Sequence, residues 1–450
     1  MYKNWLHNVI QRREEIRKSA EKDHVWIGYD PDCIKSIKKV LFIASASRSG
    51  SSLMFELVKR YPDVISTNGE TVPFYKLSEM ASDENASDEI SESEVTDEQT
   101  AFFLNEISQD MHFYHQKAVL DECERKSYAY QLALRFVMQW PMIPFDCEEL
   151  LDCIHRIIES DFAEEMIFDK DVLILKIIEK LRGKYSEINP YYYDISPTKI
   201  ETLYPEIEKP SGPPNSSLLI EEPPFLVIDP MIRMDPDQIR TSYLLMKEPV
   251  TSYRLELIKK IFSHAEFYWI HLTRNPAGCI NGLMDGWLDR GFFSFNIKNY
   301  NNKRLNMRGY SGMDRWSENW WNFDRPPGWE DVVNQSLAEV CAFQWLGNNQ
   351  AIMKGLKQEK NKITIKYEDI LSLDKRKTAF KQIEDFIGAN VPLSDIMDLN
   401  SLPVIQGTKK PQKYRWKERE TEILQVLDNA FLLELAETLG YKKDCMVEWL

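Results

Sequence analysis

The sequence predicts an α/β protein in which helices flank a parallel sheet and a large helical insertion interrupts that sheet. Short apolar runs alternate with amphipathic helices over residues 38–77, and the same alternation resumes over residues 225–387. Parallel strands need a crossover connection between them, which is usually a helix, so this alternation is typical of a parallel sheet. The residues between the two stretches follow a helical period, which places an insertion there.

The N-terminal segment is expected to contain the first strands of the sheet. Residues 2–22 are predicted to form an amphipathic helix, because their apolar side chains recur at a helical spacing. Lys38–Ala44 is then predicted as a short buried strand, Ser45–Ser52 as a small-residue turn and Leu53–Tyr61 as a helix. Val64–Thr67 is a candidate for a second strand.

The insertion is expected to begin with an acidic segment. Residues 78–100 are rich in Ser, Asp and Glu and contain no Lys or Arg, so they are predicted to form a solvated, disordered loop. A helical pattern follows over residues 101–192. The Pro-rich residues 205–225 are predicted to be a linker that returns the chain to the sheet.

The α/β pattern then continues towards the C-terminus. We divide the chain into residues 1–77 (N-terminal helix and first part of the core), 78–222 (acidic loop and helical insertion) and 223–450 (remainder of the core). The elements predicted in the third segment are strands at Phe225–Ile228, Tyr243–Met246, Glu266–Leu272 and Lys362–Tyr367 and helices at Ser252–Phe262, from Ala277, at Leu337–Leu356 and at Lys375–Ile387.

The composition argues against several classes of protein. A formal net charge of −15 disfavours a nucleic-acid partner, because phosphate binding needs clustered Lys and Arg. No apolar stretch approaches the roughly 20 residues of a membrane span, and the N-terminus lacks the apolar core of a signal peptide. The seven dispersed cysteines lack metal-ligand spacing and favour reduced thiols. We therefore expect a cytoplasmic protein without a metal or a membrane anchor; the sequence does not indicate its oligomeric state.

The turn Ser45–Ser52 carries the strongest local signal of a binding site. Backbone N–H groups at a helix N-terminus bind an oxyanion, and Gly50 allows the chain to approach it closely. Arg48 adds a planar cation that suits phosphate or sulfate oxygens, and Ser51 and Ser52 supply hydroxyl donors. The NTPase loop GxxxxGK[ST] is not present, because its first glycine and its lysine are missing. A serine-rich turn without a ligand stays an alternative.

A second cation follows a later strand. Arg274 stands just after the strand predicted at Glu266–Leu272, and Pro276 suits the first turn of the next helix. Open α/β sheets bind ligands at the carboxyl ends of their strands. Arg274 is therefore a candidate for the same ligand, with an arginine that merely caps the turn as the plain alternative.

These motifs together resemble the sulfotransferase superfamily that uses the donor 3′-phosphoadenosine-5′-phosphosulfate (PAPS). SRSGSS resembles its 5′-phosphosulfate loop, and RNP resembles its 3′-phosphate element. MKEPVTSYRLELIKKIF, IKYEDIL and KYRWKERETEILQVL resemble further segments, so the likeness covers about residues 38–77 and 225–440. The branch it resembles is the bacterial one with an arginine in the loop, akin to tyrosylprotein and carbohydrate sulfotransferases. The resemblance implies a P-loop-NTPase-like sheet, PAPS as donor and no metal, with the insertion capping the acceptor side.

The resemblance also implies which residues hold the donor. In the family a serine eight residues after the RNP arginine shares the 3′-phosphate, whereas this chain has Gly282 there, and Asn281 is a candidate substitute. The basic stretch Gly407–Lys417 resembles the loop that closes over the donor, with a solvated basic loop as the alternative. The donor-site candidates are Arg48, Ser49, Gly50, Ser51, Ser52, Leu53, Arg274, Asn281, Gly282, Lys410, Lys413 and Trp416.

Catalytic residues are implied in the same way. Sulfuryl transfer requires alignment of donor and acceptor, neutralisation of charge and removal of the acceptor proton. Glu70 matches the Gly-Glu element that carries the general base in the tyrosylprotein branch, and Lys247 resembles the lysine on the leaving side, with Arg48 as the third catalytic candidate. A solvated Glu and an exposed strand-end Lys are the plain alternatives. The histidines do not match the family's base position, which leaves only His112 or His115 within conceivable reach of the cleft.

No motif in the insertion identifies the acceptor. The tryptophans of RWSENWWNFDRPPGW either pack the core or line an acceptor pocket, which with the acidic balance would suit a cationic or planar acceptor. Our hypothesis is an enzyme that transfers a sulfuryl group to a hydroxyl or amine of a small metabolite, in natural-product tailoring. A Mg²⁺-ATP-dependent phosphoryl transferase and a catalytically silent nucleotide-binding scaffold are the alternatives.

Overall fold

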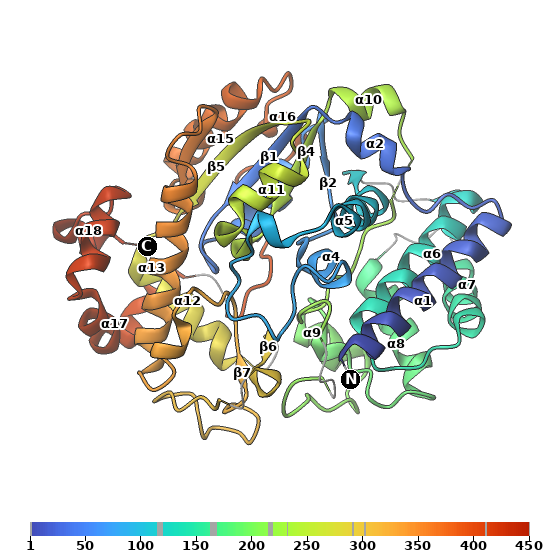
Figure 1. Ribbon diagram of the computed structural model, residues 1–450, viewed down its shortest axis with the longest axis horizontal. Coiled ribbons are helices and arrows are strands. Elements are labelled where there is room, and N and C mark those ends of the chain that lie inside the picture. The colour runs from blue at the N-terminus through green and yellow to red at the C-terminus, as the bar shows by residue number, and fades with distance from the viewer. Residues whose placement is uncertain are drawn as a thin grey trace.

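Six strands of the described residues form a sheet at the centre of the computed structural model (Figure 1). Their order is β3–β2–β4–β1–β5–β8, and all neighbours are parallel except β2 and β3. This arrangement confirms the predicted α/β class with a mostly parallel sheet. The strands are β1 (Lys39–Ala44), β2 (Val64–Ser66), β3 (His112–Phe113), β4 (Tyr243–Lys247), β5 (Glu266–Thr273) and β8 (Lys362–Lys366). The structure describes residues 2–114, 120–162, 169–214, 219–231, 233–289, 292–300, 303–409 and 412–449.

Helices cover both faces of the sheet, which explains why β1 is apolar along its whole length. Val40 and Phe42 face one layer, which includes α11, and Leu41 and Ile43 face the other, which includes α3 and α15. All four side chains are almost fully buried. A strand buried on both faces has no polar positions and therefore forms a continuous apolar run. The helices concerned are α3 (Ser51–Val58), α11 (Leu255–Ile261) and α15 (Leu373–Ile387).

The parallel strands end at one edge of the sheet, and the chain segments that follow them meet there. Ser45–Gly50 follows β1, Thr67–Glu70 follows β2, and Lys247 ends β4. Arg274 comes directly after β5, and Tyr367 directly after β8. Open α/β sheets bind ligands at this edge, so the candidate residues are placed where a ligand is expected.

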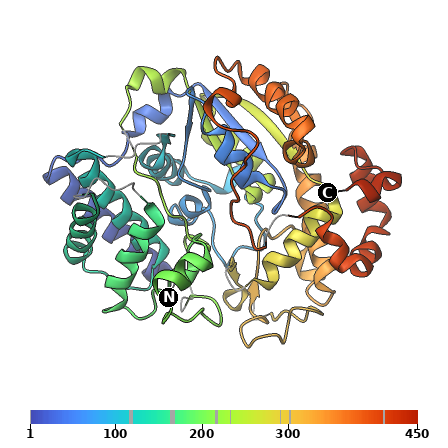
Figure 2. The ribbon, with the colours of Figure 1, turned by 180° about the vertical axis from the view of Figure 1, so that it is seen from behind.

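The insertion forms a helical bundle beside the sheet (Figures 1 and 2). The N-terminal helix α1, which was expected to accompany the first part of the core, packs on this bundle instead, against α6 and α7. Arg13 and Arg17 of α1 form buried ion pairs with Glu106 of α5, which lock the helix in place. The elements are α1 (Tyr2–Lys22), α5 (Asp97–Asp110), α6 (Glu122–Gln139), α7 (Cys147–Phe162) and α8 (Lys170–Arg182).

Two predictions about strands are wrong. Phe225–Ile228 is not a strand of the sheet, because only Phe225 forms a bridge, and its partner Tyr193 belongs to the insertion. The stretch predicted as helical, residues 101–192, contains the short strand β3, which pairs with β2 at the edge of the sheet. The run at 225–228 is apolar because Phe225 and Val227 are buried in the main core. A short apolar run reports burial, and by itself it does not separate a strand from a buried irregular segment.

The remaining elements surround the sheet and build a second apolar core. Helices α12 and α13 pack together and against α17 and α18, which lie at the left of Figure 1. Among the described helices, none combines the length and the apolar character that crossing a bilayer would need. The bounds are α2 (Pro31–Ser36), α4 (Val72–Leu77), α9 (Pro197–Leu203), α10 (Pro236–Thr241), α12 (Pro276–Leu288), α13 (Leu337–Gly355), α14 (Tyr367–Leu371), α16 (Leu393–Ile396), α17 (Glu420–Leu427), α18 (Ala430–Thr438), β6 (Phe295–Asn296) and β7 (Trp320–Trp321).

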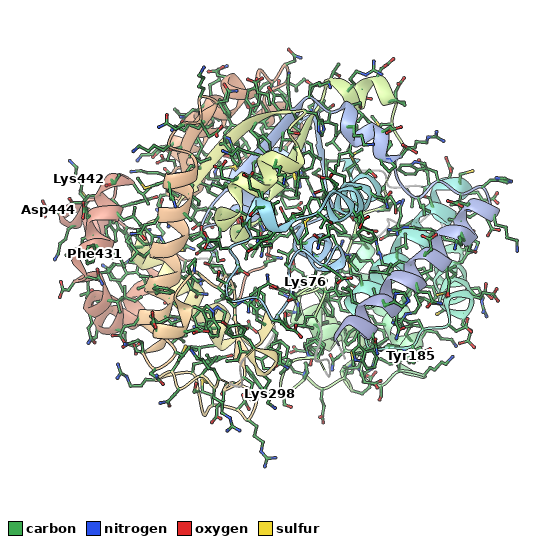
Figure 3. The ribbon with its side chains drawn as sticks, viewed as in Figure 1. Lys76, Tyr185, Lys298, Phe431, Lys442 and Asp444 are labelled. Carbon is green, nitrogen blue, oxygen red and sulfur yellow. The ribbon has the colours of Figure 1, made fainter. Side chains whose placement is uncertain are left out.

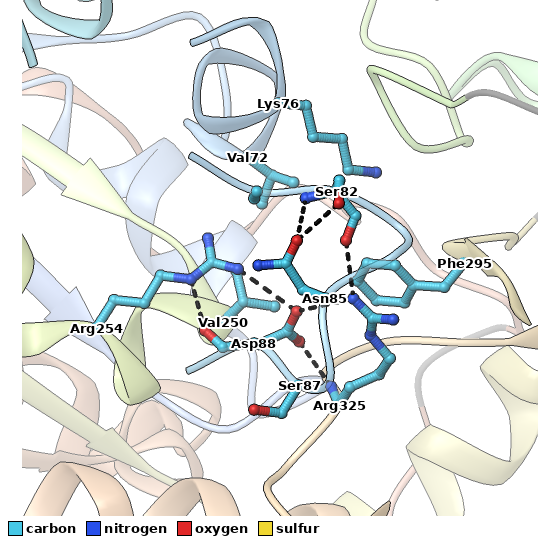
Figure 4. A pocket seen from close by; sticks show the side chains of 11 residues that line it. Val72, Lys76, Ser82, Asn85, Ser87, Asp88, Val250, Arg254, Phe295 and Arg325 are labelled. Atoms are coloured by element: carbon cyan, nitrogen blue, oxygen red, sulfur yellow. Dashed lines mark hydrogen bonds and ion pairs between the residues drawn. The ribbon is translucent and has the colours of Figure 1, made fainter. Parts of the chain in front are cut away.

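The acidic segment is partly buried, so the predicted solvated loop over residues 78–100 is wrong for its centre. Asp88 is 1% exposed, and its carboxylate accepts the backbone N–H of Arg325 at 2.6 Å (Figure 4). The guanidinium of Arg254 lies 3.4 Å from the same carboxylate. Composition misleads here, because the cations that balance the segment come from residues far away in the sequence.

Replacement of Asp88 should therefore destabilise the protein strongly. Asp88→Ala removes the buried carboxylate that Arg254 and Arg325 share, and only Arg254 keeps a further ion pair among the described residues, with Glu248 at 3.8 Å. Breaking a buried ion pair typically costs about 3–5 kcal/mol. The exposed neighbour Glu89 is the matched control, and Glu89→Ala should change the free energy of unfolding by less than about 0.5 kcal/mol. Urea denaturation measures both. Equal stability of the two variants would show that the segment is not held by this ion pair.

Candidate active site

A cleft of about 540 Å³ opens at the carboxyl edge of the sheet. The segments after β1, β2, β4 and β5 contribute to its lining, together with α12 and with residues 402–409, Gln412, Lys413, Arg415 and Trp416. Arg135 of α6, residues 221–224 and Leu226 also line it, so the end of the insertion contributes to one wall. The predicted residues in the lining are Arg48, Gly50, Ser51, Ser52, Leu53, Glu70, Lys247, Arg274, Asn281, Gly282, Lys413 and Trp416.

The loop after β1 has the backbone of an anion site. Gly50 is the N-cap of α3 and has a φ of 88°, in the left-handed region that glycine adopts readily. A Cβ at this position would overlap the ring of Tyr367, so no other residue fits without a rearrangement. The first N–H groups of α3, including those of Ser51 and Ser52, are thereby presented at the cleft.

Arg48 belongs to this loop, and contacts with two other segments hold its side chain in place. Its φ of 63° is also left-handed, which is uncommon for a residue with a side chain. Its guanidinium donates to the carbonyl of Gln406 at 3.1 Å and lies over the ring of Phe292. Burial, and after it the positive charge of Arg274, lower the pKa of Arg48 to about 10. The side chain is therefore still a cation at neutral pH.

Arg274 lies next to Arg48, and both approach Gly282. The Arg274 guanidinium donates to the backbone carbonyl of Arg48 at 2.7 Å and stacks over Tyr367. A Cβ on Gly282 would lie 3.4 Å from both the Arg274 guanidinium and the Arg48 side chain, which is an ordinary van der Waals contact. The candidate substitute Asn281 lines the cleft, but its side-chain oxygen accepts a hydrogen bond from Arg419 at 2.6 Å.

The two catalytic candidates form an ion pair across the cleft. Lys247 donates to Glu70, and its Nζ is also 3.0 Å from the hydroxyl of Ser52. The Lys247 side chain is 6% exposed, whereas that of Glu70 is 36% exposed. Lys247 therefore joins the predicted base to the first turn of α3, and neither residue is the solvated side chain of the plain alternative.

The C-terminal basic stretch closes one side of the cleft through residues that the sequence did not single out. Asp285 of α12 is buried and forms ion pairs with Lys409, Arg415 and Arg419. Lys409 and Arg415 also line the cleft. Arg415 lies inside the basic stretch Gly407–Lys417, but the sequence does not indicate which of the basic residues there reaches the cleft.

Other predicted residues have less direct positions. Lys413 is exposed at the rim of the cleft, and Lys410 lies outside the described residues. Trp416 touches the cleft but is 3% exposed, and its indole N–H donates to the carbonyl of Trp449. The hydroxyl of Ser49 is absent from the described lining and contacts the thiol of Cys279. Trp416 and Ser49 thus have packing roles in this structure.

The alternatives for the base and for the tryptophans can be compared with the structure. His112 is buried in β3, where burial lowers its pKa to about 4, and it is not among the described residues that line the cleft; His115 lies outside them. The four tryptophans Trp316, Trp320, Trp321 and Trp329 are not in the described lining either. All except Trp316 are at most 4% exposed, which confirms the packing interpretation.

Asp324 is a residue of the cleft that no sequence motif indicated. Its side chain is 1% exposed and accepts hydrogen bonds from the hydroxyls of Ser47 and Tyr253, both at 2.8 Å. Burial raises the pKa of Asp324 to about 6. Ser47 immediately precedes Arg48, so this carboxylate anchors the loop that turns at Arg48. Asp324, Ser47 and Tyr253 come from three separate segments of the chain, which explains why no local pattern reveals this residue.

The chain belongs to the sulfotransferase family, whose family model matches residues 41–392. The protein is therefore a sulfotransferase, as its motifs predicted. No curated protein matches it. Two solved structures are similar: the sulfotransferase domain from the curacin biosynthetic pathway (12% identity, 90% of this chain and 99% of that chain, TM-score 0.36) and the sulfotransferase domain from the Synechococcus PCC 7002 olefin synthase (13% identity, 90% and 96%, TM-score 0.34).

Titration of Asp324 should be visible in the stability of the protein. Because the pKa is raised from 3.8 to about 6, the folded state binds this proton more tightly than the unfolded chain. The protonated Asp324 therefore stabilises the folded state. This stabilisation is complete below about pH 4 and is lost as the pH rises through about 6. Wild type loses this contribution between pH 4.5 and pH 7, whereas the asparagine of Asp324→Asn does not titrate. The free energy of unfolding of Asp324→Asn should therefore rise by about 2 kcal/mol relative to that of wild type over this pH range. Urea denaturation at both pH values tests this, and parallel pH dependence of the two proteins would contradict it.

Proposed function

We propose that the protein uses PAPS as its donor and transfers the sulfuryl group to a hydroxyl or amine of a small molecule. The observation that carries this proposal is the meeting, in one cleft, of an anion-binding helix start, two arginines and a Glu–Lys pair. These groups are the N-terminus of α3, Arg48, Arg274 and the pair of Glu70 with Lys247. They supply the three requirements of sulfuryl transfer, namely donor binding, charge neutralisation and a base.

The donor carries two anionic groups that need separate sites. The N–H groups at the start of α3, together with Arg48, suit the phosphosulfate. Arg274 and Arg415, which both line the cleft, suit the 3′-phosphate. Burial lowers the pKa of Arg415, and the positive charge of Arg274 lowers it further. A dianion bound between them would remove their mutual repulsion. The side-chain carboxylate of Asp285 keeps Arg415 in place beforehand.

In the proposed reaction, Glu70 would act on the acceptor and Lys247 on the leaving group. The acceptor oxygen or nitrogen forms a bond to sulfur while the bond from sulfur to the phosphate oxygen breaks. Glu70 would take the proton that the acceptor loses. Once protonated, Glu70 no longer holds the ammonium of Lys247 by charge, which leaves Lys247 beside Ser52 to neutralise the leaving phosphate. The ion pair thus links proton removal to stabilisation of the leaving group.

The cleft of about 540 Å³ would have to hold the donor as well as the acceptor, and this volume lies within the range of small-molecule sites, which supports a small acceptor rather than a polymer. We accordingly propose a tailoring enzyme that acts in the cytoplasm on a metabolite. The phosphoryl-transfer alternative would require Mg²⁺-ATP to bind better than PAPS. The scaffold alternative would require donor binding without turnover on any acceptor.

Binding of the product 3′-phosphoadenosine-5′-phosphate (PAP) tests the donor site. Arg274→Ala and Arg415→Ala should each weaken PAP by about tenfold or more, since each removes a charge-assisted contact. Lys417→Ala is the matched control from the same basic stretch, because Lys417 is exposed and is not among the described lining residues. Calorimetry with PAP, with adenosine 5′-phosphate and with Mg²⁺-ATP measures the effect. Indifference to the 3′-phosphate, or tighter binding of Mg²⁺-ATP, would reject the donor assignment.

Loss of the base should affect turnover and leave donor binding intact. Glu70→Gln keeps the shape of the side chain but cannot take a proton, so kcat should fall by about 10²–10³-fold. The PAP dissociation constant should stay within about twofold of wild type. Release of PAP from PAPS, with an acceptor chosen from a panel of phenols, alcohols and amines, gives the rate. Glu84→Gln, at an exposed position, is the control, and retention of wild-type kcat by Glu70→Gln would exclude Glu70 as the base.

A further inference from the structure

Glu222 is a carboxylate of the acceptor wall that the proposed reaction does not use. It lines the cleft, and its side chain is 26% exposed. Its Oε1 lies 3.2 Å from the ammonium of Lys76, which is itself 1% exposed and lies in the interior of the molecule (Figure 3). Ser294 donates a hydrogen bond to the same carboxylate. The position of Glu222 is therefore fixed, while part of it stays open to the cleft.

The lining next to Glu222 combines an internal ion pair with apolar residues. Glu221 and Arg135 pair with each other. Pro223, Pro224 and Leu226, which follow Glu222 in the chain, also line the cleft. A carboxylate partly removed from water is costly unless a cation accompanies it.

The other carboxylates of the cleft have their partners within the protein. Glu70 is paired with Lys247, and the buried Asp324 accepts hydrogen bonds from two hydroxyl groups. Glu221 is 5% exposed, is paired with Arg135 at 2.5 Å and accepts further hydrogen bonds from Gln139 and Leu226. Within the described lining, Glu222 is thus the carboxylate outside the proposed reaction that is open to an incoming ligand.

Glu222 adjoins a buried cluster of charged side chains, part of which Figure 4 shows. Lys76 contacts Glu222 in this cluster, and Arg254 and Arg325 pair with Asp88. Burial raises the pKa of Glu222 although Lys76 lies beside it, so the desolvation of this carboxylate is not fully offset. A ligand cation at the open side of Glu222 would stabilise its ionised form. The four described carboxylates of the cluster are Asp83, Asp88, Glu222 and Glu248.

We propose that Glu222 binds a cationic group of the acceptor, so that the acceptor is an amine-bearing molecule with an apolar body. The sulfated hydroxyl or amine would lie at Glu70, and a separate ammonium would contact the part of Glu222 that is open to the cleft. Of the four carboxylates in the cluster, only Glu222 is among the described residues that line the cleft, so an acceptor reaches the cluster there. This inference rests on the proposed function, because it assigns a substrate class to the same site.

A matched pair of phenols tests the proposal. Tyramine and 4-ethylphenol have the same ring and chain length and differ in the ammonium, which tyramine carries at pH 7. Calorimetry with the protein saturated by PAP should show at least about tenfold tighter binding of tyramine to wild type, since a charge-assisted contact is typically worth that much. Glu222→Gln should reduce the difference to less than about threefold and leave 4-ethylphenol unchanged. Glu206→Gln, an exposed position on the insertion, should behave as wild type.

The outcomes separate this inference from the proposed function. Equal binding of the two phenols to wild type, failure of both to bind, or a tyramine preference that survives in Glu222→Gln would each overturn the role of Glu222. The wild-type comparison does not depend on the variant, so a folding defect in Glu222→Gln leaves the test intact. Failure of wild type to bind PAP would instead reject the donor assignment, before any phenol is added.

Discussion

The approach of two arginines at one edge of the sheet is the constraint on which the rest of the site depends. The guanidinium of Arg274 donates to the backbone carbonyl of Arg48, and the left-handed turn at Arg48 orients that carbonyl. Position 50 requires glycine, because its backbone is left-handed and a Cβ there would overlap the ring of Tyr367, on which Arg274 stacks. Like charges held together in a partly buried site favour an anion between them. The fold therefore prepares a site that an anionic donor completes.

A second constraint is the number of charges that the protein buries around this site. Asp285 gathers three cations from the C-terminal stretch, and Asp88 joins two arginines to the acidic segment. Each network links segments that are distant in sequence, and the one around Asp285 holds Lys409 and Arg415 of the cleft lining. Buried ions are expensive unless they are paired, so the networks restrict how the insertion and the C-terminal stretch can sit on the sheet. Specific positioning of the walls follows from this restriction.

The sequence predicted the donor loop well and the charged networks poorly. Arg48, Gly50 and Arg274 lie in the cleft as expected, because each directly follows or caps a regular element whose direction the sheet sets. Asp324 was missed, since its partners Ser47 and Tyr253 are recognisable only once three segments meet. The acidic segment was judged by its composition, which carries no information about cations elsewhere in the chain.

The sequence by itself determined the α/β class, the anion-binding turn and the family, because these depend on local order: a strand, a small-residue turn and a helix in succession. Only the tertiary structure decided which charges meet. Glu70 and Lys247 are 177 residues apart, and they touch because β2 and β4 are neighbours in the sheet. Glu222 joins Lys76 in the same way, across the boundary between insertion and core. Pairing of this kind depends on strand order and packing, which no local pattern of residues encodes.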